Sequence, residues 1–317
     1  MPHAKGNGRV TVVGAGNVGS NTARRIAEND LCDEVVMIDI VEGLPQGLAL
    51  DISQSAPVEH FSTHVTGTNS YKDTADSSVC VVTAGLPRKP GMSRMDLLDK
   101  NAEIVGGVVE QLAEHSPEAT LVIVSNPLDE MTYLASLVSG FPKERVMGMA
   151  GVLDSSRLRY FISEKLDVSP FEVEAMTLGS HGDQMVALPR HATVQGKPLP
   201  ELVDDQTLEE LFQRTKDGGA EIVGYLKKGS AFYAPSSSVF AMVESILTDD
   251  GEIHPTCAWT TGQYGVSDVY LGVPARLGRG GVKEIVELEL NPDELAQLKE
   301  AAGSIRAKCD ELSARRN

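Results

Sequence analysis

The fold is decided by Gly14-Ala15-Gly16-Asn17-Val18-Gly19, because of the segments that lie on each side of it. Residues 9–13 (RVTVV) form an apolar, β-branched run that predicts a buried strand. Residues 17–29 have apolar side chains at helical spacing, and a second apolar run at 34–38 is followed by Asp39. Strand, glycine-rich turn, helix, strand and acid, in this order, predict a dinucleotide-binding site.

The glycines of this turn have separate roles in such a site. Gly14 permits the tight turn, Gly16 lets the backbone approach a pyrophosphate, and Gly19 allows close packing of the helix. The helix N-terminus supplies amide donors and the positive end of its dipole. The Asp39 carboxylate suits a ribose 2′-hydroxyl and repels a 2′-phosphate, which favours NAD over NADP. The glycine pattern alone would be a weak signal, and the flanking elements make the difference.

The composition limits the classes of function. The chain has 317 residues, 41% of them hydrophobic, which suits two domains that share a cleft. No apolar run reaches the roughly 18 residues of a membrane span, and the N-terminus has no apolar signal region. The net charge of −17 argues against nucleic acid and anionic membranes as partners, since both would be repelled. The same charge fits an ordinary acidic enzyme or adaptation to a salty cytoplasm.

The cysteines indicate the redox compartment. The four of them are scattered, and none belongs to a CxxC pair. We therefore expect buried free thiols rather than disulfides or a zinc site. Free thiols fit a reducing compartment, so we expect a cytoplasmic protein. The cysteines are Cys32, Cys80, Cys257 and Cys309.

The order of apolar runs predicts the fold class. Runs alternate with helical patterns, such as those at 45–55 and 128–139, through residues 1–150. This alternation predicts an α/β fold with a Rossmann-type, doubly wound parallel sheet, covered by helices on both faces. From residue 151 the pattern becomes mixed, with a strand predicted at 173–178. Residues 151–317 are therefore predicted to form an α+β catalytic domain that binds the substrate.

Two polar segments follow predicted strands, at the sheet edge where open α/β sheets bind ligands. Residues 84–94 (AGLPRKPGMSR) combine two prolines, two glycines and three cations, as a lid over a cleft would, although a solvated basic loop has the same composition. Residues 125–127 (SNP) place Asn126 at the edge of the sheet, although a simple helix cap would explain them equally well.

Two further segments contain candidate catalytic groups. Asp154 and Arg157 lie on one face of a predicted helix, as many surface ion pairs also do. His181 lies between glycines in residues 179–183 (GSHGD), directly after a predicted strand. Close backbone approach at the glycines makes it a plausible general acid–base, whereas a lone histidine would more often be incidental.

Taken together, these segments resemble a known family. The runs GAGNVG, AGLPRKPGMSR, SNP, LDSSR and GSHGD, between about residues 9 and 285, resemble the lactate/malate dehydrogenase family in order and spacing. The resemblance implies that the enzyme uses NAD to transfer a hydride to and from a 2-hydroxy acid. It also implies a homo-oligomer, with a tetramer favoured over a dimer.

The resemblance implies a role for each segment. His181 would be the proton donor and acceptor, and Asp154 would fix its tautomer and stabilise the imidazolium. Arg157 would clamp the C1 carboxylate of the substrate, and Arg94 would polarise the reacting carbonyl, so no metal is expected. Asn126 would contact the substrate. The residues implied to bind the cofactor are Gly14, Ala15, Gly16, Asn17, Val18, Gly19, Asp39, Asn101, Val124, Ser125 and Asn126.

Arg88, six residues before Arg94, indicates the substrate. In the family that the chain resembles, lactate dehydrogenases typically have glutamine at this position, and malate dehydrogenases have arginine. A C4 dicarboxylate brings a second carboxylate into the closed site, and leaving such a charge unpaired costs on the order of 2–5 kcal/mol. The resemblance therefore implies reversible oxidation of malate to oxaloacetate with NAD, as in the lactate-dehydrogenase-like subgroup of malate dehydrogenases.

Three other functions are compatible with parts of the sequence. A lactate dehydrogenase would use the same chemistry on pyruvate, and only Arg88 argues strongly against it. A family 4 glycosidase has a similar NAD-binding half but needs a metal and a cysteine, and no cysteine lies near His181 in the sequence. A catalytically inactive NAD-binding regulator would be expected to lose His181 or Arg157, and both are present.

We predict that the fold and its oligomer become more stable as salt increases. The charge of −17 repels itself at low ionic strength, and about 1 M salt shortens the screening length to roughly 3 Å. The melting temperature and the oligomer mass should therefore rise between about 0.05 and about 2 M KCl. A flat or falling melting temperature would show that the acidic surface is not tuned to salt.

Overall fold

The computed structural model describes residues 8–86, 94–182 and 184–316. Its helices are α1 Asn17–Glu28, α2 Leu44–Glu59, α3 Arg94–His115, α4 Leu128–Ser139, α5 Gly151–Leu166, α6 Asp205–Leu226, α7 Tyr233–Thr248 and α8 Pro292–Arg316. Its strands are β1 Arg9–Val13, β2 Glu34–Ile38, β3 His64–Thr68, β4 Ser77–Val82, β5 Thr120–Ile123, β6 Val146–Gly148, β7 Val173–Glu174, β8 Thr177–Gly179, β9 Met185–Ala187, β10 Thr193–Val194, β11 Lys197–Pro198, β12 Ile253–Thr261, β13 Ser267–Gly278 and β14 Gly281–Ile285.

The first half forms the predicted doubly wound sheet. Its strands are parallel and lie in the order β3-β2-β1-β4-β5-β6, which is the Rossmann order. Strand β4 shows why both faces are covered: Val79 and Val81 pack into one apolar cluster with α1 and α7, and Cys80 and Val82 into another with α3 and α4. The predicted fold class is confirmed.

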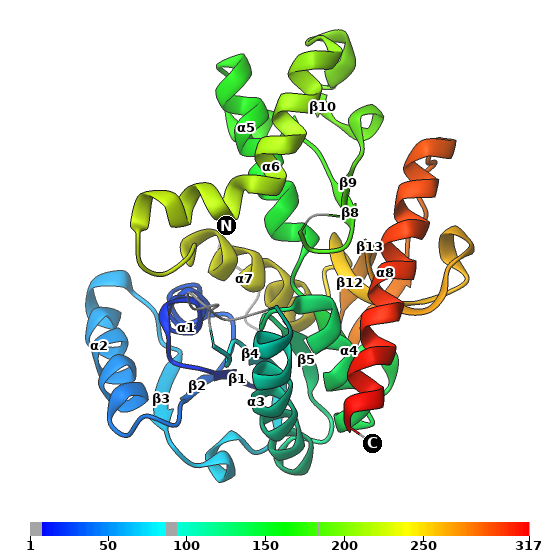
Figure 1. Cartoon of the computed structure of the whole chain (residues 1–317). Coiled ribbons are helices and arrows are strands. Elements are labelled where there is room, and N and C mark those ends of the chain that lie inside the picture. Colours follow the sequence, from blue (N-terminus) through cyan, green and yellow to red (C-terminus); the bar gives the residue numbers. More distant parts are fainter. Residues whose placement is uncertain (1–7, 87–93, 183, 317) are drawn as a thin grey trace.

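The second half continues the same sheet. Strand β12 pairs antiparallel with β6, where Cys257 lies opposite Gly148, and the sheet then extends through β13, β8 and β9. Strands β7, β10 and β11 form a small separate sheet. This sheet shares an apolar cluster with α5 and α6, which form the upper lobe in Figure 1. The sheet therefore runs on past residue 150, and the predicted domain boundary there stays a prediction.

Two seams in the sheet depend on glycine. At the β6–β12 seam, a Cβ on Gly148 would lie 2.5 Å from the Thr132 hydroxyl oxygen and 3.0 Å from the Cβ of Cys257. At the β13–β8 seam, a Cβ on Gly272 would lie 2.3 Å from the carbonyl oxygen of Gly179. Because an added methyl group has no room, the strands reach this spacing only where glycine is present.

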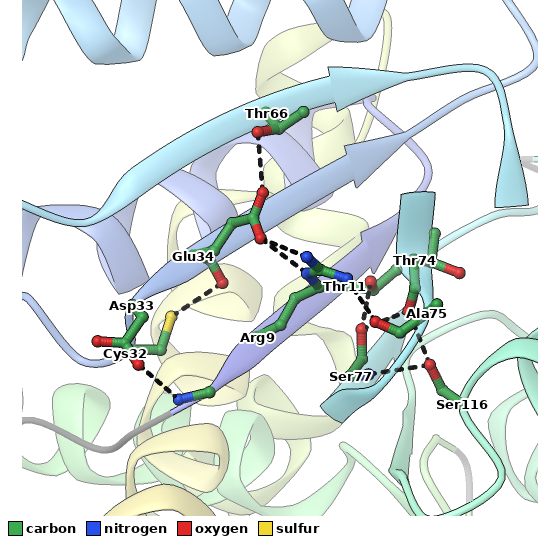
Figure 2. Close-up of polar contacts among 11 residues, drawn as sticks. Arg9, Thr11, Cys32, Asp33, Glu34, Thr66, Thr74, Ala75, Ser77 and Ser116 are labelled. Carbon is green, nitrogen blue, oxygen red and sulfur yellow. Dashed lines mark hydrogen bonds and ion pairs between the residues drawn. The ribbon is translucent and has the colours of Figure 1, made fainter. Parts of the chain in front are cut away.

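A polar network joins the amino ends of the parallel strands (Figure 2). Arg9 of β1 donates to Glu34 of β2 at 2.8 Å, and the same carboxylate accepts a bond from Thr66 of β3 at 3.1 Å. The backbone amide of Ser77 in β4 donates to the buried hydroxyl of Ser116 at 3.0 Å. These bonds hold the strands at the edge away from the glycine-rich turn, so the opposite ends of the strands are aligned.

Two predicted elements differ from the structure. Helix α2 continues past residue 55 to Glu59, with Pro57 in its last turn, where a proline removes only one helical bond. The strand predicted at 173–178 is split, because β7 pairs with β10 in the small sheet whereas β8 pairs with β13 in the large one. The chain changes sheets between them.

The remaining sequence predictions concern thiols and membranes. All four cysteines are buried and none forms a disulfide, as predicted. Among the described helices, none is long and apolar enough to cross a bilayer.

We predict opposite effects for two glycine-to-alanine substitutions. Gly272→Ala should lower the free energy of unfolding by about 1–3 kcal/mol, because its methyl group meets a strand backbone. Gly107→Ala, the matched control on the exposed face of α3, meets nothing within 4 Å. It should raise the free energy of unfolding by roughly 0.5–1 kcal/mol through helix propensity. Urea unfolding measures both, and equal effects would argue against the tight seam.

Candidate active site

The glycine-rich turn between β1 and α1 has the geometry that a dinucleotide requires. Gly14 has a φ of +98°, which favours glycine, and its amide donates to the carbonyl of Ile38 at 2.8 Å. A Cβ on Gly19 would lie 1.8 Å from the carbonyl oxygen of Gly14. A Cβ on Gly16 would meet nothing within 4 Å, so open space lies beside the N-terminus of α1. This space and the helix dipole fit the pyrophosphate of NAD.

Two side chains hold this turn in place. Asp39, at the end of β2, accepts a bond from the backbone amide of Ala15 at 2.7 Å. Thr83, at the end of β4, donates to the carbonyl of Gly14 at 3.1 Å. Thr83 was not selected from the sequence, although its position at the carboxyl end of a strand could have indicated it. The contact of Asp39 with the cofactor ribose stays a prediction.

Asn101, buried in α3, joins two of the predicted segments. Its Oδ1 accepts a bond from the amide of Leu86 at 2.8 Å, and its Nδ2 donates to the carbonyl of Asn126 at 2.6 Å. The hydroxyl of Ser125 donates to the carbonyl of Ala84 at 2.5 Å. The amide of Asn101 therefore ties the loops after β4 and β5 together, and its contact with the cofactor stays a prediction.

Asp154, His181 and Arg157 form an ion cluster. Asp154 lies in the first turn of α5, with 3% of its side chain exposed. Its Oδ2 lies 2.8 Å from Nδ1 of His181, and its Oδ1 lies 3.3 Å from a terminal nitrogen of Arg157. The negative charge of Asp154 raises the pKa of His181 above its ordinary 6.5, whereas burial acts in the opposite direction. The cluster places a proton-exchanging imidazole near a cation.

Helix α6 covers Arg157. A Cβ on Gly218 of α6 would lie 3.1 Å from Cδ of Arg157, so the glycine lets the helix pack on the stem of the side chain. Burial lowers the pKa of Arg157, and the charge of Asp154 opposes this change. Among the described residues, the buried Nε of Arg157 has no hydrogen-bond partner. A planar cation with an unused donor suits the carboxylate of a ligand.

A cavity of about 670 Å³ opens beside the imidazole. Its lining includes Asn126, His181 and Gly182, with Leu98 from α3. It also includes Asp129, whose carboxylate accepts a bond from the backbone amide of His181 at 3.3 Å. Asp129 was not selected from the sequence, where it has the pattern of an ordinary acid in the first turn of a helix. The volume suits a small-molecule ligand.

The structure describes the remaining predicted residues to different extents. Val124 follows β5 and is partly buried. Arg94 is the first residue of α3, and its side chain lies outside the described part of the chain. Arg88 lies outside the described residues altogether. The structure thus brings His181 together with Asp154 and Arg157, while the roles of these site residues stay predictions.

The fold and the site together define a class of protein. A nucleotide turn at the edge of a Rossmann sheet, a histidine paired with a carboxylate and a buried arginine are the features of an NAD-dependent dehydrogenase that oxidises an alcohol group. Residues 8–148 match the model of the lactate/malate dehydrogenase NAD binding domain, and residues 151–315 match that of the lactate/malate dehydrogenase alpha/beta C-terminal domain. The chain belongs to the lactate/malate dehydrogenase family.

Individual relatives agree with this assignment. The chain is 55% identical over 304 residues to a malate dehydrogenase of Salinibacter ruber, covering 96% of each chain. A solved malate dehydrogenase structure from Salinibacter ruber has a TM-score of 0.93 at 52% identity, covering 97% of this chain and 98% of the other. A lactate dehydrogenase from Cryptosporidium parvum, solved with lactic acid and nicotinamide adenine dinucleotide, has a TM-score of 0.93 at 36% identity, covering 98% and 99%.

We predict that Asp154→Asn lowers the pKa of His181. The carboxylate raises that pKa in the native protein, and burial lowers it once the charge is removed. NMR titration of the imidazole resonances measures the change, with His254 as an internal control. Burial lowers the pKa of His254, and the charged groups acting on it are Asp250 and Glu252, so its titration should not move. An unchanged His181 pKa would contradict the assigned pairing.

Proposed function

We propose that the chain is an NAD-dependent malate dehydrogenase, which interconverts malate and oxaloacetate. The observation that carries this proposal is the carboxylate of Asp154 held between His181 and Arg157, at 2.8 and 3.3 Å. Oxidation of a 2-hydroxy acid needs a proton acceptor and a partner for the carboxylate, and these two side chains supply both. The 55% identity to a protein named malate dehydrogenase supports the same substrate.

The proposed mechanism uses the two nitrogens of the imidazole differently. Nδ1 of His181 is bonded to Asp154, so Nε2 accepts the proton of the 2-hydroxyl group as malate is oxidised. Arg157 binds the C1 carboxylate, and Asp154 stabilises the imidazolium that forms. Bound NAD supplies the acceptor for the hydride that leaves C2. In the reverse direction, protonated His181 donates its proton to the C2 carbonyl oxygen of oxaloacetate.

The second carboxylate distinguishes malate from lactate. The architecture cannot make this distinction, because the chain is as similar in fold to a lactate dehydrogenase as to a malate dehydrogenase. Arg88 is proposed to neutralise the C4 carboxylate, with Arg94 polarising the carbonyl and Asn126 contacting the substrate. The position of Arg88, six residues before Arg94 in the sequence, supports this proposed selectivity for malate.

The protein is further proposed to act as a homo-oligomer, a tetramer rather than a dimer, in the cytoplasm. Large apolar side chains are exposed on α2 (Leu50 and Val58) and at the C-terminal end of α6 (Val223 and Tyr225). Contact between subunits would remove such surface from water. Buried thiols that form no disulfide support a reducing compartment.

We predict that Arg88→Gln shifts the ratio of kcat/KM for oxaloacetate to kcat/KM for pyruvate by ~10³ or more towards pyruvate. The substitution removes the partner of one carboxylate and also removes a charge that would be unpaired beside a methyl group. Lys89→Gln is the matched control, since it removes a charge from the neighbouring position of the same segment. The two kcat/KM values are obtained by measuring NADH oxidation with oxaloacetate and with pyruvate. A ratio that moves equally in both variants would show that Arg88 does not select the substrate.

A further inference from the structure

Asp129 is a buried acid that the proposed mechanism does not use. It lies in the first turn of α4 and is only 3% exposed. Its Oδ2 accepts bonds from the hydroxyl of Ser180 at 2.7 Å and from the backbone amide of His181 at 3.3 Å. Its Oδ1 accepts a bond from the thiol of Cys257 at 3.4 Å. All three partners are donors, which is the arrangement that suits an ionised carboxylate.

The pKa shifts of Asp129 and Cys257 bear on that arrangement. The pKa of Asp129 is raised, because burial outweighs the bond from Ser180 and the charge of His181, which both favour the ionised form. Burial also raises the pKa of Cys257 well above its ordinary value, so the thiol keeps the proton that it donates. A buried carboxylate is costly unless it is paired and hydrogen-bonded, and two of its three partners belong to one loop.

Residues 179–182, here called the histidine loop, begin at the end of β8 and are closed by backbone bonds from Ser180 to Gln184 at 3.4 Å and from Met185 to Gly182 at 3.1 Å. Gly179 has a φ of +87° and Gly182 a φ of +130°, so the chain turns through left-handed conformations on both sides of the imidazole. Asp129 contacts the two residues that lie between these glycines. It therefore ties the histidine loop to α4, while Asp154 holds the ring itself from α5.

We propose that Asp129 is a positioning residue for the acid–base reaction, which sets the place of His181 through the histidine loop and adds its charge to that of Asp154 in favouring the protonated imidazole. The inference rests on the proposed function. The charge of Asp129 acts on His181 in the same direction as that of Asp154, and Arg157 acts against both. Within residues 8–86, 94–182 and 184–316, the other titratable groups near these two residues are Glu130 on α4, Cys257 on β12, and Lys308, Cys309 and Glu311 on α8.

The test is the pH dependence of oxaloacetate reduction by Asp129→Asn. Reduction requires protonated His181, so kcat/KM falls as the pH rises through the pKa of the imidazole. Loss of a nearby negative charge lowers that pKa, so this fall should occur at lower pH than in the wild type. The kcat should drop about 10- to 100-fold because the imidazole is misplaced, whereas the Kd for NADH should stay the same.

The adjacent residue provides the matched control. Glu130 is also buried, at 5% exposure, and Glu130→Gln makes the same chemical change. Its carboxylate pairs with Lys308 at 3.6 Å, and the charges that act most strongly on the pKa of His181 are those of Asp154, Asp129 and Arg157. The pH profile and kcat of Glu130→Gln should match the wild type.

Ser180→Ala tests the positioning role of Asp129 separately from the effect of its charge. This variant also provides a test if Asp129→Asn does not fold. It removes one donor and keeps the carboxylate, so kcat should fall about three- to tenfold, while the pH profile stays in place. An unchanged kcat for Ser180→Ala would overturn the positioning role. A wild-type pH profile in Asp129→Asn, or the same shift in Glu130→Gln, would overturn the electrostatic role. If the wild type does not reduce oxaloacetate at all, the proposed function fails instead.

Discussion

The rest of the site depends on one buried carboxylate, that of Asp154. Asp154 lies in the first turn of α5, the helix that follows β6 at the end of the parallel part of the sheet, and each of its carboxylate oxygens has a different partner. Removing one partner from a buried ion pair costs on the order of 3–5 kcal/mol, because it leaves a charge uncompensated. His181 and Arg157 are therefore held relative to each other before any ligand arrives, and little of the geometry has to be created by binding.

The other segments of the site lie side by side along one edge of the sheet. Its neighbouring strands β1, β4, β5 and β6 lead in turn into the glycine-rich turn, Thr83, Ser125 and the helix that carries Asp154. A cofactor lying across these ends would span from the turn to the imidazole. The polar network at the amino ends (Figure 2) supports this alignment from the far side, since it joins β1 to β2 and β4, and β2 to β3.

The sequence predicted features that are encoded within a short segment. The strand at 9–13, the glycine-rich turn and the helix at 128–139 follow from local spacing, and the structure has each of them. Apart from the pairing of Asp154 with His181, which the family resemblance implied, it did not predict contacts between distant segments. Asp129 meets a residue 51 positions away, and Gly272 matters only because another strand approaches it. The pairing of β6 with β12 joins residues 109 positions apart, and no local pattern encodes such a pairing.

The continuous sheet also has a mechanical consequence. Because β6, β12, β13 and β8 are hydrogen-bonded in succession, the nucleotide turn and the histidine loop belong to one frame. A hinge motion that separated the nucleotide turn from the histidine loop would have to break strand pairing along this path, for example where Gly148 pairs with Cys257 or Gly272 with Gly179. Entry and exit of ligands then depend on loops that are not part of this continuous sheet. Such connections can vary in sequence, and so in the molecules that they admit, without disturbing the distance over which a proton and a hydride travel.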